Sequence, residues 1–160
     1  MNLMLKCMSI TLRKANINDI TALAEMNQQL IQDERSRNPL NVGQLKLRMQ
    51  TWLDGSWSAI MIYKHDDLIG YLMYQQREDD YYPDLRVIFV RQFFVQRAYR
   101  RRGIGRQAFE QITQQFFPSD AKVMLDVLAT NSEALSFWED LGFTQYATSL
   151  HRNAPSSAQA

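Results

Sequence analysis

The chain has 160 residues, of which 46% are hydrophobic and 22% charged, enough for one sizeable core but hardly for two. Its 18 Lys and Arg residues against 17 Asp and Glu leave a formal charge of +1, which excludes a protein that coats nucleic acid or a membrane by charge. A single cysteine excludes an internal disulfide, and with two histidines it predicts no metal site. We expect one domain over residues 1–152 and a disordered tail over 153–160.

No apolar run approaches the ~20 residues that span a bilayer, and residues 1–8 are too short for the core of a signal peptide. The sequence therefore predicts a cytoplasmic protein with no membrane partner. Either Met1 or Met8 is its natural start.

The first third of the chain predicts one strand and two helices. A short β-rich run at 10–12 leads to Asn16, a good helix cap with Asp19 three residues later. Apolar residues then recur at helical spacing. A polar connection over 33–43 precedes a second, less regular helix at 45–53.

The middle of the chain predicts a hairpin, a long strand and a helix. Two β-rich runs at 59–63 and 68–74 flank a turn-like stretch. After a polar segment at 75–80, the run at 85–95 is long and aromatic enough for a central strand. Apolar residues every four positions over 103–118 then indicate a helix.

The last part predicts a strand at 123–128, a helix at 130–141 with a Thr130/Glu133 capping box, and a final strand at 143–151. This order of elements indicates an α+β protein with a mixed sheet rather than regular βαβ alternation. Helices should cover both faces of that sheet.

The run Arg100–Arg106 carries the most specific chemical signal. Its glycines allow a tight turn, and the helix that follows begins with unpaired amides. Those amides, the helix dipole and the neighbouring arginines together favour phosphate oxygens. The segment therefore predicts a pyrophosphate-binding loop.

The spacing R-x-x-G-x-G that begins at Arg100, shortly after the Phe93-Phe94-Val95 run, resembles motif A of the GNAT acetyltransferases. A second block at 131–143, N-x-x-A-x-x-F-W-x-x-x-G-F, resembles motif B of the same family. The opening at 10–19 is also similar to the usual GNAT opening, so the resemblance covers nearly the whole chain.

The resemblance implies a mostly antiparallel sheet with one splayed parallel strand pair that holds the pantetheine arm of acetyl-CoA, and it makes a homodimer reasonable. Backbone groups of Phe93 and Val95 would bind that arm as an added strand does. No metal is implied. The expected cofactor-binding residues are Phe93, Phe94, Val95, Arg100, Arg101, Arg102, Gly103, Ile104, Gly105, Arg106, Asn131 and Trp138.

The catalytic residues are less well defined. An alkyl amine with a pKa near ~10.4 is almost wholly protonated at pH 7, so acetyl transfer needs help with deprotonation. The glutamate that some relatives use would fall at Phe89, which leaves Asp126, Glu78 or a water chain. The tyrosine that many relatives use as an acid is replaced by Trp138, whose indole cannot serve, so Tyr146 or water would protonate the leaving sulfur.

The implied activity is transfer of acetyl from acetyl-CoA to a primary amine of a small molecule or peptide, by direct attack without a covalent enzyme intermediate. Asp33 and Glu34, at the end of the first helix, are candidates to attract a cationic substrate. The acceptor cannot be named from the sequence.

Other interpretations stay open. The arginine run could be a solvated surface, Asn131 a plain helix cap, and Trp138 part of a core. The loss of the strand glutamate and the motif B tyrosine would also suit a non-catalytic acyl-CoA sensor. A dinucleotide-binding domain is disfavoured because Ala108 stands where the third glycine is needed and the motif comes late in the chain.

Overall fold

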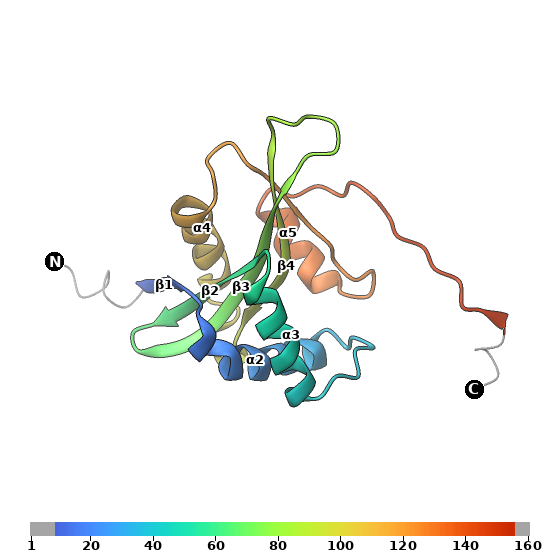
Figure 1. Ribbon diagram of the computed structural model, residues 1–160. Coiled ribbons are helices and arrows are strands. Elements are labelled where there is room, and N and C mark those ends of the chain that lie inside the picture. Colours follow the sequence, from blue (N-terminus) through green and yellow to red (C-terminus); the bar gives the residue numbers. More distant parts are fainter. Residues whose placement is uncertain (1–8, 156–160) are drawn as a thin grey trace. The chain divides into compact units, whose positions relative to one another are not determined.

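The computed structural model describes residues 9–155, which form two compact units, one through Leu128 and the other from Ala129 onward (Figure 1). A single domain over 1–152 stays a prediction. The choice between Met1 and Met8, and most of the tail, lie outside the described residues.

Strands and helices alternate irregularly along the chain, as the sequence predicts. They are β1 (Ile10–Lys14), the 3-10 turn η1 (Ile17–Asp19), α2 (Ile20–Asp33), α3 (Val42–Asp54), β2 (Trp57–Lys64), β3 (Asp67–Glu78), β4 (Arg86–Val95), the 3-10 turn η2 (Arg97–Tyr99), α4 (Ile104–Phe116), β5 (Lys122–Leu125) and α5 (Ser132–Asp140).

The first unit contains a five-stranded sheet in the order β1-β2-β3-β4-β5. The first four strands pair antiparallel and β5 joins β4 in parallel, so the predicted mixed, mostly antiparallel sheet is confirmed. β3 is longer than expected. Its polar end pairs with β4 as far as Glu78↔Arg86, because the long apolar strand supplies backbone partners that local composition does not reveal.

Helices cover both faces of this sheet, as predicted (Figure 1). On one face α2 and α3 share a core with alternate residues of the central strands, among them Met61 and Met73. On the other face α4 contributes Phe109, whose ring packs edge-on against Phe93 of β4. The period-two alternation of strand side chains is what gives each face its own core.

The connection from β1 to α2 forms as its sequence predicts. The side chains of Asn16 and Asp19 make a reciprocal capping box around η1, and Asp19 also accepts two hydrogen bonds from Arg13, at 2.7 and 2.8 Å. This ion pair fixes the direction in which α2 leaves the first strand.

Two predictions for the last part of the chain are wrong. The helix cap is Asn131, whose side chain accepts from the Ala134 amide, and not Thr130 with Glu133. Residues 143–151 form no strand. A strand needs a partner for its backbone groups, and the described residues of the second unit contain one helix and no other strand.

Candidate functional site

The outer edge of β4 is paired over only part of its length. β5 pairs with it from Val87 to Val90 and then ends at Leu125, whereas β3 remains paired as far as Val95. The stretch from Arg91 to Val95 therefore extends past Val90↔Leu125, the last residue pair between β4 and β5. This is the splayed parallel pair that the sequence predicts.

The direction of the backbone groups on this edge of β4 follows from the hydrogen bonds that β4 makes with β3 on its other edge. The Gln96 amide donates to the Ile69 carbonyl of β3 at 2.7 Å. Because antiparallel residues alternate, Phe94 also faces β3, whereas Phe93 and Val95 point their N–H and C=O groups to the opposite edge. These are the two residues that the sequence predicts for binding an extended ligand arm.

The stretch of β4 from Arg91 to Val95 leads through η2 and a short loop into the N-terminus of α4. Arg101 and Gly103 both adopt positive φ, 61° and 75°. Gly103 is the N-cap, no side chain caps the helix, and its first backbone bond runs from Gln107 to Gly103. The amides of Ile104 and Gly105 precede that bond, so α4 presents its positive end toward this loop.

Space is open where a ligand would approach Gly103, since a Cβ built there meets no atom within 4 Å. Arg101 and Arg102 are exposed, and Arg106 on the first turn of α4 is exposed and pairs with Glu110 at 3.3 Å. Open space, helix amides and arginines together fit an anionic diphosphate.

Arg100 has a different position from its neighbours. Its guanidinium donates to the Val95 carbonyl at 2.6 Å and to Asp33 at 2.5 Å, and Arg97 donates to the same carboxylate. Burial opposes ionisation of Asp33, but the bonds from Arg100 and Arg97 outweigh it and hold the pKa of this carboxyl below its usual range. Asp33 thus joins the end of α2 to the loop, and its contact with substrate stays a prediction.

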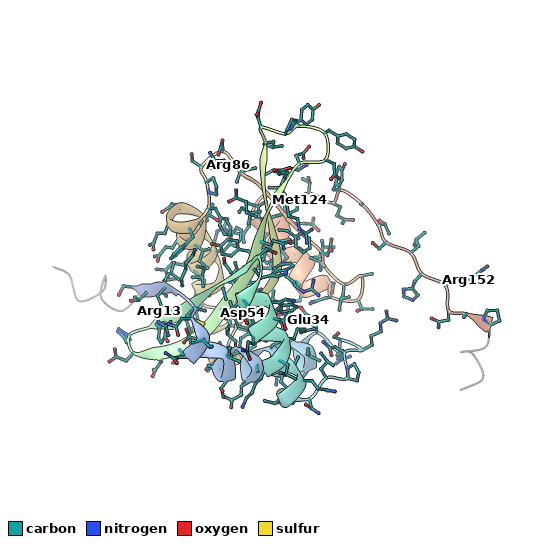
Figure 2. All side chains as sticks on the ribbon, viewed as in Figure 1. Arg13, Glu34, Asp54, Arg86, Met124 and Arg152 are labelled. Carbon is teal, nitrogen blue, oxygen red and sulfur yellow. The ribbon has the colours of Figure 1, made fainter. Side chains whose placement is uncertain are left out.

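Glu34, labelled in Figure 2, is the residue that follows α2. Burial, assisted by the charge of Asp33, raises the pKa of its carboxyl. It is half-buried and makes no ion pair among the described residues. Asp126, the other acidic candidate, is exposed and follows β5 directly.

The remaining candidates lie in the second unit. Asn131 caps α5. Trp138 is buried and its ring packs edge-on against Phe143, with centroids 5.3 Å apart, as a core residue does. Tyr146 is 81% exposed. Their roles toward a cofactor stay predictions.

The structure also reveals polar side chains that the sequence analysis missed, on the sheet face covered by α2 and α3. Arg48 donates to Asn27 at 2.7 Å, and Tyr71 donates to Gln92 at 2.9 Å. Asn27 is fully buried. Its place on the apolar face of α2, between Leu23 and Leu30, was the available signal, because a polar residue there needs a specific partner.

Within residues 9–155 no helix is both long and apolar enough to cross a bilayer. The same part of the chain holds no group of three His, Cys, Asp or Glu side chains that could bind a metal.

The model of the acetyltransferase (GNAT) family matches residues 25–143. A search of curated proteins finds no match. Among solved structures, a possible acetyltransferase from Clostridium difficile 630 has a TM-score of 0.75 and 19% identity, over 91% of this chain and 97% of its own.

Two further structures carry ligands. A predicted acetyltransferase from Clostridium acetobutylicum with acetyl-CoA has a TM-score of 0.71 and 13% identity, over 91% of this chain and 96% of its own. An aminoglycoside acetyltransferase from an uncultured soil metagenomic sample, in complex with sisomicin, has a TM-score of 0.68 and 15% identity. The match covers 91% of this chain and 95% of that one. At these identities the likeness is one of fold.

Proposed function

The chain belongs to the GNAT acetyltransferase family, whose model matches most of its length, and we propose that it transfers acetyl from acetyl-CoA to a primary amine by direct attack. The observation that carries this proposal is the continuity of two features. The part of β4 that extends past its pairing with β5, and includes Phe93 and Val95, leads directly into a helix end that no side chain caps, with arginines around it.

The residues present fit acetyl-CoA. The outward N–H and C=O of Phe93 and the N–H of Val95 would pair with the amides of its pantetheine arm, as a neighbouring strand would. The loop from Arg101 to Gly103 and the first amides of α4 would hold its pyrophosphate. Arg100 is a positioning residue, since its guanidinium already binds Val95 and Asp33.

Acetyl-CoA supplies an acetyl group activated as a thioester. The chain must hold the amine beside it and accept the amine's proton, because a neutral amine at pH 7 costs roughly 4 to 5 kcal/mol. Asp126 and Glu34 are the acidic candidates in the first unit, and the raised pKa of Glu34 brings it closer to neutral pH. Tyr146 is the candidate acid.

A second candidate is a non-catalytic acyl-CoA sensor. Phe89, where some relatives have the glutamate, lies beneath the guanidinium of Arg77 at 4.1 Å from the ring centroid and cannot accept a proton. Trp138 replaces the usual tyrosine. A sensor would bind acetyl-CoA tightly and turn over no amine.

Titration calorimetry with acetyl-CoA tests the cofactor site, with Gly103→Glu and Gly103→Ala as a matched pair. Both variants carry a side chain at positive φ, so they share the backbone cost of about 1 kcal/mol, but only the glutamate places a negative charge at the helix end. We expect micromolar binding in the wild type, modest weakening in Gly103→Ala and loss in Gly103→Glu. Wild-type protein that fails to bind would overturn the proposal.

Release of free CoA across a panel of primary amines separates the two candidates. Turnover of at least one amine well above thioester hydrolysis supports the enzyme. Binding without turnover across the whole panel supports the sensor. A cytoplasmic location and a homodimer are further predictions, checked by fractionation and by light scattering.

A further inference from the structure

A polar cluster lies on the α2/α3 face of the sheet, beside the part of β4 that β5 does not pair. It consists of Asn27, Arg48, Tyr71 and Gln92, joined in pairs by the bonds from Arg48 to Asn27 and from Tyr71 to Gln92. Asn27 and Tyr71 are completely buried among the methionines and leucines of the core. Neither the proposed cofactor site nor the fold itself requires polar groups here.

Two atoms of this cluster lack a hydrogen-bond partner. Asn27 Nδ2 and Arg48 Nε are buried and unpaired among the described residues. Burial raises the pKa of the Tyr71 phenol, and the nearby Asn27 amide opposes this only weakly, without meeting the geometry of a hydrogen bond. Both orphan atoms are donors, so the group that completes the cluster must be an acceptor.

The charge around the cluster favours an anion. The guanidinium groups of Arg48 and Arg91 lie 4.5 and 4.7 Å from the ring centroid of Trp52. In the part of the chain that the structure describes, neither arginine has a carboxylate partner. Burial and then the charge of Arg91 lower the pKa of Arg48, yet an arginine keeps its charge in proteins.

The cluster meets the edge of β4 at a β-bulge, at the point where pairing with β5 ends. Met73 pairs with Gln92 and Tyr74 with Val90, so Arg91 is the extra residue between them. It is also the first residue beyond the last rung with β5. Since Arg91 is exposed and Arg48 half-buried, the cluster is reached from solvent at the point where the two strands part.

Resting on the proposed function, we infer that the acceptor is an amine that also carries a carboxylate, bound by Arg48, Arg91 and Asn27. Two neighbouring buried donors suit the two oxygens of a planar carboxylate better than a larger tetrahedral phosphate. Glu34 lies near enough to Tyr71 to act on its phenol, so an acidic group borders the same cluster. A zwitterionic amino acid presents matching charges of both signs.

The test compares amines that differ only by the carboxylate. Phenylalanine with phenethylamine, and lysine with cadaverine, are assayed for CoA release and for calorimetric binding to the CoA-saturated protein. One charge-assisted contact pair predicts a preference of about 10- to 100-fold for the carboxylated member. Sisomicin, a polycation, and phosphoethanolamine are added to the panel. Preference for either of these, or for the decarboxylated amines, overturns the inference.

Arg48→Gln provides the decisive variant and Arg77→Gln its control. Arg77 lies on the same face over Phe89 and Trp57, and within residues 9–155 its side chain donates a hydrogen bond to Gln75 alone. We expect Arg48→Gln to reduce the carboxylate preference to near unity while acetyl-CoA affinity, which reports folding, is kept. Arg77→Gln should keep the preference. An unchanged preference in Arg48→Gln overturns the inference, whereas failure of acetyl-CoA to bind at all would instead overturn the proposed function.

Discussion

At the scale of single residues, Asp33 shows how one carboxylate can join two segments that lie far apart in the chain. It accepts hydrogen bonds from Arg97 and Arg100, which lie 64 and 67 positions later in the chain. Its side chain is only 12% exposed, whereas that of Arg97 is 76% exposed. Solvent weakens the outer contact, so Arg100 is the stronger partner. The end of α2 thereby holds the start of the loop that leads into α4.

We predict that Asp33→Asn weakens acetyl-CoA binding about 5- to 30-fold, which corresponds to about 1–2 kcal/mol for the lost charge-assisted contacts. Calorimetry measures the dissociation constant. Asp66→Asn is the control, because Asp66 is exposed in the hairpin turn and has no partner among the described residues. Equal affinities for the two variants would show that Asp33 does not position the loop.

Gly70 is a second position where a single atom decides the local structure. A Cβ built there would lie 2.1 Å from the Phe94 carbonyl oxygen of β4, which is backbone and cannot move aside cheaply. We predict that Gly70→Ala lowers the free energy of unfolding by about 1–3 kcal/mol, measured in urea.

The matched control is Gly43→Ala in the first turn of α3. There the nearest atom to a new Cβ is the Asn41 side-chain oxygen at 3.3 Å, and alanine favours a helix. We expect no loss of stability in this variant. Equal destabilisation by the two substitutions would contradict the role given to Gly70.

At the scale of elements, β4 combines a buried strand and an open one. Its first half is paired on both sides, whereas beyond Val90 only β3 pairs with it. We predict that in protein without acetyl-CoA the amide of Val95, which points away from β3, exchanges hydrogen faster than those of Gln92 and Phe94, which face β3.

Addition of acetyl-CoA should then slow exchange at Val95 selectively, because that amide gains a hydrogen-bond acceptor. Amide exchange resolved by NMR measures both states. Uniform slowing across the whole sheet would indicate general stabilisation rather than binding along the edge.

At the scale of the whole molecule, the lowered pKa values of two carboxyl groups make the free energy of unfolding depend on pH in the acidic range. Hydrogen bonds from Arg13 lower the pKa of Asp19 despite its burial, and those of Arg100 and Arg97 lower that of Asp33. A lowered folded-state pKa contributes stability that is fully present above the unfolded value of about 3.9 and is lost as pH falls through the folded value.

We therefore predict that the urea midpoint falls more steeply below about pH 4 in the wild type than in a variant with Asp19→Asn and Asp33→Asn together. Near pH 7 the variant should be the less stable protein, and the difference should shrink in acid. If the urea midpoints of the wild type and the variant fell in parallel between pH 7 and acid, the two carboxylates would not link stability to pH.

The sequence alone determined the features whose cause is local. Period-two and helical spacing identified the described strands and helices within a few residues, and the Asn16 cap and the Arg100–Gly105 loop depend on neighbours close in the chain. The predicted strand at 143–151 failed because β structure depends on a partner strand, which composition cannot supply.

Only the tertiary structure decided which distant groups meet. It brought Asp33 to Arg100, turned the backbone groups of Phe93 and Val95 away from β3, and placed the unpaired Asn27 Nδ2 and Arg48 Nε donors beside the bulge at Arg91. Hydrogen bonds and ion pairs act over a few ångströms of space whatever the separation along the chain, so their partners are fixed by packing and not by spacing in the sequence.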